Sequence, residues 1–178
     1  MRASQFVLLA FVFASLPLSA QAVEKEGRQA MSIGTELNEF SGSFGVGANF
    51  TSPYYFENSF AVRITFNQAW LPATVGTEQT WYGFQVLRVG LVGGSIMKDM
   101  MRMYGVGGLL VGFPNSAFSS STVVGGFGAF GFEFISGHSV NYFIELGALG
   151  TGAQAEKVAG QPIYLNGFQS TVGFRYSL

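Results

Sequence analysis

Residues 43–51 read SFGVGANFT, and apolar residues alternate in this stretch with glycine and small polar residues. Successive side chains of a β-strand point to opposite faces, so a period of two separates one face from the other. One face would carry Phe44, Val46, Ala48 and Phe50, and the other Ser43, Gly45, Gly47, Asn49 and Thr51. The stretch therefore predicts a strand with one apolar face and one polar face.

The same alternation recurs along the chain. It is clear in five further segments, residues 31–38, 60–68, 130–134, 139–147 and 167–178, where Phe143 is out of pattern. Two glycine-rich segments, residues 80–90 and 102–112, complete the set, but their pattern does not fix which face is which. Turn residues separate the segments at 38–42, 52–58, 71–72, 93–95, 113–115, 136–138 and 151–161. Eight strands in regular succession predict an all-β barrel or sandwich.

The charge content decides which face of the sheet meets water. Only 11% of the residues are charged, against ~25% in an ordinary soluble domain. A soluble barrel needs charged residues on its outer face, whereas a membrane barrel turns apolar residues to lipid and polar residues inward. Strands can span a bilayer only as a closed barrel, because every backbone group must be paired. The sequence therefore predicts an eight-stranded antiparallel transmembrane β-barrel with up-and-down meander topology.

The N-terminus predicts export. Arg2 precedes an apolar run at residues 6–14, Pro17 follows it, and Ala20-Gln21-Ala22 offers a small-x-small cleavage pattern. The run is too short to span a membrane, which requires ~20 apolar residues. We expect a cleaved signal peptide at residues 1–22 and a barrel domain at 23–178. The absence of cysteine favours a bacterial envelope.

Connector lengths offer a test of the strand count. Bacterial barrels have short periplasmic turns, longer outer loops and both termini in the periplasm. With eight strands, residues 136–138 become the shortest connector, on the periplasmic side, and residues 151–166 form an outer loop.

The last eight residues carry a more specific pattern. They read TVGFRYSL, with Gly173, Phe174 and Tyr176 before a terminal Leu178. This ending resembles the signal that the outer-membrane barrel-assembly machinery recognises, although Leu178 stands where Phe is commoner. In size, strand number and ending, the chain resembles the small OmpA/OmpX-type outer-membrane barrels of Gram-negative bacteria. The resemblance implies an outer-membrane location, contact with outer-membrane lipid and the assembly machinery as a partner in biogenesis.

Isolated charges lie on the polar faces of the predicted strands. They are Glu36, Arg63, Glu133, Glu145 and Arg175, and Arg88 or Arg102 is expected to join them. Charges enclosed in a narrow interior must pair, because burial of an unpaired charge costs several kcal/mol. Side chains fill an eight-stranded barrel, so the sequence predicts an ion-pair network that closes the lumen. A proton path, a gate or a paired-carboxylate site is the alternative interpretation.

The chain offers little for catalysis. His138 is the only histidine, next to Ser139 and upstream of Glu145, and lipid A deacylases of barrel type use Ser and His. Neighbouring strand residues point to opposite faces, however, so we expect a turn-surface histidine and no catalytic site. With no cysteine and one histidine we expect neither a metal site nor a cofactor, and a net charge of −1 argues against nucleic acid. Residues 126–131 match G-x-G-x-x-G only by letters, because no helix pattern follows.

The function predicted from these features is a non-enzymatic structural or surface-interaction role in the outer membrane. The alternatives are a lipid-modifying, deacylase-like enzyme and a narrow channel. Aromatic residues near strand ends are expected to form interfacial girdles. These are Tyr54, Tyr55, Phe56, Trp70, Trp81, Tyr82 and Tyr176. Residues 113–121 and 151–166 are expected to be loops that contact ligands or partners.

Overall fold

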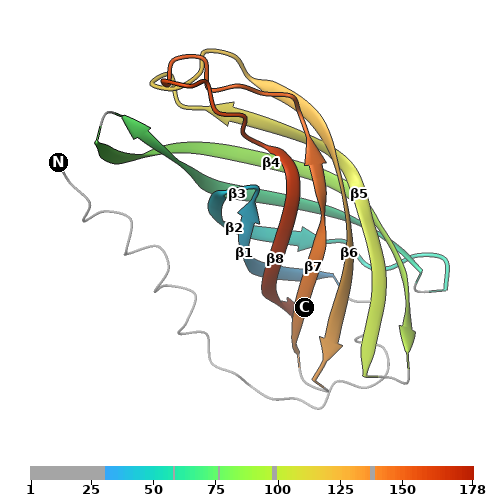
Figure 1. The fold of residues 1–178 in the computed structure, drawn as a ribbon. Coiled ribbons are helices and arrows are strands. Elements are labelled where there is room, and N and C mark those ends of the chain that lie inside the picture. The colour runs from blue at the N-terminus through green and yellow to red at the C-terminus, as the bar shows by residue number, and fades with distance from the viewer. Residues whose placement is uncertain (1–30, 58, 76, 98–99, 137–138) are drawn as a thin grey trace.

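A closed barrel of eight antiparallel strands accounts for most of the computed structural model, which describes residues 31–57, 59–75, 77–97, 100–136 and 139–178. Each strand pairs with its neighbours in sequence, and β8 closes the ring against β1 (Figure 1). The strands are β1 (Ser32–Phe40), β2 (Ser43–Thr51), β3 (Phe60–Val75), β4 (Glu78–Met97), β5 (Met101–Pro114), β6 (Val123–Ile135), β7 (Val140–Gly150) and β8 (Asn166–Ser177). The predicted fold is confirmed. The predicted signal peptide, residues 1–22, lies outside the described residues.

The residues that alternate in the sequence point alternately to the interior and the exterior of the barrel. On β2, Phe44 and Phe50 are exposed on the exterior, whereas Asn49 and Thr51 are buried in the interior. The same division holds on β8, where Phe174 is exposed and its neighbour Arg175 is 1% exposed. The exterior is thus apolar and the interior polar. The described part of the chain contains no helix with the length and apolar character needed to cross a membrane.

The two strands whose faces the sequence left open are β4 and β5. Arg88 and Arg102 both lie inside, at 3% and 5% exposure. Valines alternate with glycines and leucines on these strands, so both faces of β4 are apolar and only the arginines mark the inner side. Strand pairing with β3 and β6, which no local pattern encodes, fixes the register.

Two predicted turns are wrong because both lie within strands. Pro72 lies in β3, beyond Trp70, where the pairing of β3 with β2 ends. Proline has no backbone N–H to donate. It is tolerated here because β3 has lost its β2 neighbour at this point and one of its edges is unpaired. Residues 93–95 lie in β4, and a Cβ on Gly94 would stand 2.6 Å from the Cα of Tyr104. Glycine at this position allows β4 and β5 to approach closely and does not form a turn.

The barrel has a terminal end and a loop end. At the terminal end lie the start of β1, the end of β8, and the strand ends that lead from β2 to β3, from β4 to β5 and from β6 to β7. At the loop end lie the opposite strand ends, with residues 41–42, 115–122 and 151–165. The expectation that residues 136–138 form the shortest connector is wrong, because Ser41 and Gly42 alone join β1 to β2. Both residues have positive φ, 48° and 94°, which suits a two-residue hairpin turn.

Two loops at the loop end pack over the barrel mouth, and we call residues 115–122 and 151–165 the cap. The backbone N–H of Lys157 donates to the carbonyl of Phe118 (3.1 Å), and Ser120 N–H donates to the Glu156 carboxylate (2.8 Å). Phe118 is fully buried and contacts the rings of Phe84 and Tyr164, with centroids 6.0 and 5.0 Å away. The cap therefore forms an apolar core above the polar interior.

Candidate functional site

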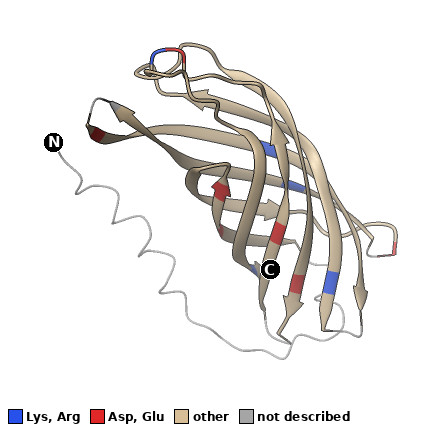
Figure 2. Cartoon of the chain, in the orientation of Figure 1, with Lys and Arg blue, Asp and Glu red and all other residues tan. Residues whose placement is uncertain are grey.

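The polar interior of the barrel is the candidate site. The structure places all five charges predicted for the lumen there, together with both open candidates. Their exposures are Glu36 3%, Arg63 4%, Arg88 3%, Arg102 5%, Glu133 6%, Glu145 3% and Arg175 1%. Each sits on a different strand, and β2 alone of the eight strands contributes no charge. Figure 2 shows how few charged positions interrupt the strands.

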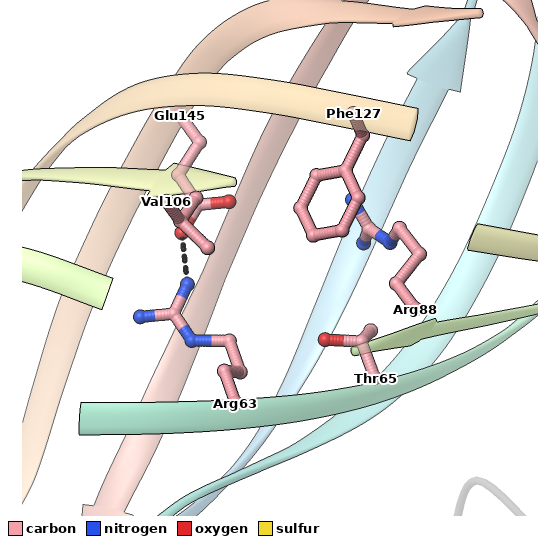
Figure 3. A pocket seen from close by; sticks show the side chains of 6 residues that line it. All are labelled: Arg63, Thr65, Arg88, Val106, Phe127 and Glu145. Carbon is pink, nitrogen blue, oxygen red and sulfur yellow. Dashed lines mark hydrogen bonds and ion pairs between the residues drawn. The ribbon is translucent and has the colours of Figure 1, made fainter. Parts of the chain in front are cut away.

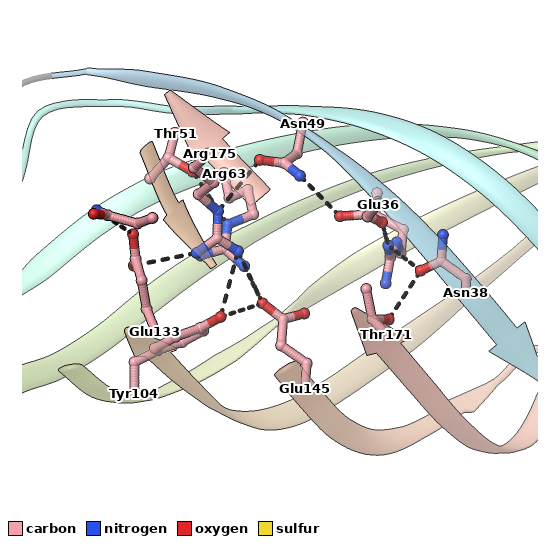
Figure 4. A network of polar contacts seen from close by, with 12 residues as sticks. Glu36, Asn38, Asn49, Thr51, Arg63, Tyr104, Glu133, Glu145, Thr171 and Arg175 are labelled. Atoms are coloured by element: carbon pink, nitrogen blue, oxygen red, sulfur yellow. Dashed lines mark hydrogen bonds and ion pairs between the residues drawn. The ribbon is translucent and has the colours of Figure 1, made fainter. Parts of the chain in front are cut away.

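Glu145 is the centre of the first group of contacts, the Glu145 cluster of Arg63, Tyr104, Glu133, Glu145 and Arg175 (Figure 4). Its Oε1 accepts hydrogen bonds from Arg63 Nη1, from Tyr104 Oη (2.6 Å) and from Arg175 Nη2 (3.1 Å). Arg175 Nη1 also lies 3.2 Å from Glu133 Oε2. Two arginines and two glutamates thus form a neutral group held by four strands and by the Tyr104 hydroxyl of β5.

A second group, the Glu36 cluster, lies nearer the loop end and contains Glu36, Asn38, Asn49, Asn67 and Arg88. Glu36 forms an ion pair with Arg88 and accepts hydrogen bonds from Asn49 Nδ2 (2.9 Å) and Asn67 Nδ2 (3.1 Å). Arg88 also contacts Asn38 Oδ1 at 3.4 Å, and Asn38 accepts from Thr171. Arg175 Nε donates to Asn49 Oδ1 (3.3 Å), so Asn49 connects the two clusters.

Aromatic rings flank the guanidinium groups of both clusters. Arg175 lies over the ring of Phe143 at 3.7 Å from the centroid, and Arg88 lies between Phe40 and Phe127 at 5.6 and 5.4 Å. Cation–π contact of this kind stabilises a desolvated arginine. It also explains why Phe143 departs from the alternation of β7, because the ring packs inside the barrel beside Arg175.

Inward-facing glycines make the room that these side chains occupy. A Cβ on Gly131 would stand 2.6 Å from Tyr104 Cζ and 2.9 Å from Glu145 Cγ. A Cβ on Gly34 would stand 2.9 Å from Arg175 Cγ. The small residues on the polar face therefore serve the packing of large polar groups within a narrow barrel.

Little space is left between the clusters. Arg63, Thr65, Arg88, Val106, Phe127 and Glu145 line a cavity of about 10 Å³ (Figure 3). A cavity of this size accommodates about one water molecule. Buried atoms without a hydrogen-bond partner in the structure include Arg63 Nη2 and Arg88 Nε, both on side chains that line the cavity.

Sequence reasoning missed Tyr104 and the three asparagines. The asparagines fall on the polar faces, so alternation could have indicated their burial but not their partners. Tyr104 lies on β5, where glycines obscure the alternation, and its hydroxyl is positioned by pairing with β4 and β6. No local signal identifies it.

The residues of the predicted assembly signal lie on β8 and at its end. Phe174, Tyr176 and Leu178 are exposed on the exterior, whereas a Cβ on Gly173 would stand 2.7 Å from the Phe143 ring. Their part in assembly stays a prediction. His138, the one histidine considered for catalysis, lies outside the described residues.

Seven aromatic residues are predicted for the girdles. Trp70 is half-buried and stacks on the exposed ring of Phe44, with centroids 6.3 Å apart, and the other six residues divide into two groups. Tyr55, Phe56, Trp81 and Tyr176 are exposed. Two others point inward, which corrects their assignment to a girdle: Tyr82 packs against Phe118, and Tyr54 stacks on Arg102.

An eight-stranded meander with an apolar exterior and a filled polar interior is the architecture of the small outer-membrane β-barrels. The N-terminal barrel domain of Pseudomonas aeruginosa OprF matches this chain with a TM-score of 0.58 and 8% identity, over 84% of this chain and 98% of that one. Ail, the attachment invasion locus protein of Yersinia pestis, matches with a TM-score of 0.49 and 14% identity, over 84% and 97%. No protein-family model and no curated protein matches the sequence.

Proposed function

We propose that this chain is an integral outer-membrane protein whose barrel is a sealed anchor and whose loop end makes contacts outside the cell. The observation that carries the proposal is the reversed polarity of the barrel. Large apolar side chains around the ring are exposed, among them Ile33, Phe50, Ile64, Leu91, Phe130 and Val172. An exterior of this kind requires a lipid solvent, and a closed ring leaves no unpaired strand edge within it.

The contents of the interior support a sealed lumen. The two clusters fill its middle, the cavity between them measures about 10 Å³, and the cap packs Phe118 into the loop end. A hydrated ion needs a continuous water-filled path, and side chains packed this closely argue against one. A structural role for the interior follows, and it is favoured over a channel.

The loop end supports a contact function. Residues 71–75 of β3 and 78–83 of β4 extend as a two-stranded ribbon beyond the point where β2 and β5 stop pairing with them (Figure 1). Trp81 on this ribbon is 55% exposed, and Ile163 of the cap is 54% exposed. In this class of barrel the longer loops face outward and the termini face the periplasm, which would present the ribbon and cap to the outside.

The experiment combines envelope fractionation, heat-modifiable gel mobility and planar-bilayer conductance of the purified protein. We expect a heat-modifiable band in the outer-membrane fraction and no conductance steps. Arg63→Leu and Arg175→Leu should lower the urea midpoint and leave conductance at zero. A soluble monomer in plain buffer would overturn membrane insertion, and conductance by the unaltered protein would overturn the sealed lumen. A changed lipid A mass spectrum in cells lacking the gene would favour the lipid-modifying alternative.

A further inference from the structure

Arg102 is a buried arginine that neither cluster uses. It lies on the inner face of β5, two residues closer to the terminal end than Tyr104, and is 5% exposed. Across the described ranges, no carboxylate approaches it within 4.0 Å, and its Nε is buried without a hydrogen-bond partner.

The other inward charges balance one another. Arg63, Arg88 and Arg175 each contact a glutamate, and the described interior holds the three glutamates that serve them. Glu133 is the register partner of Arg102 on β6, yet its carboxylate is bound by Arg175 Nη1 (3.2 Å) and Asn141 Nδ2 (3.0 Å). Among the described residues of the interior, Arg102 is therefore the one charge that no charge of opposite sign balances.

Tyr54 determines which side of the guanidinium group is available. Tyr54 belongs to the 52–59 connector at the terminal end, and Arg102 Cζ lies 3.6 Å from the centroid of its ring. Stacking occupies a face of the planar group and leaves its N–H donors, which lie in the plane, free to bind. Two parallel N–H groups of a guanidinium fit the two oxygens of a carboxylate or phosphate.

We infer that Arg102, held by Tyr54, is an anion-binding residue at the terminal end of the barrel and takes a small oxyanion group, a phosphate or a carboxylate. A buried arginine without a counterion is strongly destabilising, so the folded barrel binds an anion that supplies the missing charge. Both groups present a pair of oxygens that can accept hydrogen bonds from the planar guanidinium group. The group belongs either to a free ion such as inorganic phosphate or to an organic carboxylate.

The test is thermal unfolding of the full chain folded in detergent, followed by heat-modifiable gel mobility at constant ionic strength. Sodium phosphate and sodium acetate replace sodium chloride in separate titrations, which distinguishes the two sources. Binding to the folded state raises the folded-to-unfolded ratio about a hundredfold at one hundred times Kd. We expect a saturable rise in Tm with at least one oxyanion, none with Arg102→Gln, and an unchanged response with Lys157→Gln, which alters an exposed cation of the cap. An equal response in the unaltered protein and Arg102→Gln would overturn the inference.

Two further variants keep the test decisive. Arg102→Lys retains the charge without the planar fork, so oxyanion binding should weaken at least about tenfold. If Arg102→Gln does not fold, an unchanged response in Arg102→Lys would overturn the inference. Asp99, which lies outside the described residues, is the nearest acidic residue in sequence. An oxyanion response that appears only in Asp99→Asn would identify Asp99 as the counterion and would also overturn it.

Discussion

Glu145→Gln is the substitution that most directly tests the interior network. The carboxylate accepts hydrogen bonds from Arg63, Arg175 and Tyr104, and it is the one described carboxylate that contacts Arg63. Arg175 keeps Glu133 in the variant, whereas Arg63 loses its counterion. Removal of one partner from a buried ion pair costs about 3–5 kcal/mol. With a urea m-value of about 2 kcal/mol/M, the unfolding midpoint should fall by roughly 2 M.

Urea unfolding of the protein in detergent, followed by heat-modifiable gel mobility, measures this shift. Glu78→Gln is the matched control, because Glu78 is exposed near the tip of the ribbon and its replacement should cost less than about 0.5 kcal/mol. The double variant Arg63→Leu/Glu145→Gln should be less destabilised than the sum of its single variants, since it removes both partners. Equal midpoints for Glu145→Gln and Glu78→Gln would refute the network as a source of stability.

Two further predictions concern packing. Gly131→Ala should lower the free energy of unfolding by about 1–3 kcal/mol, because the added Cβ meets Tyr104, whereas Gly128→Ala on the exterior has nothing within 4 Å and should change it by less than about 1 kcal/mol. Equal urea midpoints for the two variants would contradict the role of inner glycines. Phe118→Ala should open the cap, because a buried Phe→Ala change costs about 3–5 kcal/mol. Limited proteolysis should then cut residues 151–165 while heat-modifiable mobility persists, and an uncut loop would count against the cap as a local unit.

The parts of the fold that the sequence predicts are those governed by a period of two. β2 and β8 each have one apolar exterior face and one polar interior face. On these strands the type of a residue therefore indicates whether its side chain points outward or inward. On β4 the inner residues Val86 and Val92 are as apolar as the outer Val89 and Leu91, and the direction of Arg88 depends on pairing with β3. The pattern of residues within β4 does not indicate which residues of β3 pair with it.

The cap illustrates a second limit of the sequence. Phe118 lies in a serine-rich loop without periodicity, yet it is fully buried against Phe84 and Tyr164. Its burial arises from contact between loops about 35 to 45 residues apart in sequence, such as Lys157 N–H to the Phe118 carbonyl. The small, polar composition of these loops describes their exposed residues and not the buried ones, and it identifies no ligand or partner.

Single charges placed one to a strand also fix the register of the barrel. A shift of one residue in the pairing of a strand moves all its side chains to the opposite face. For β8, such a shift would turn Arg175 toward lipid and would move Phe174 and Tyr176 into the polar interior. An arginine that faces lipid costs about 2–4 kcal/mol at the bilayer midplane and about 0–1 kcal/mol near an interface, and Arg175 lies near the terminal end of its strand. Seven of the eight strands carry one such inward charge, and β2 carries Asn49 at the connection between the clusters. The ion pairs that occupy the lumen therefore also penalise each misregistered barrel, whatever their net contribution to stability.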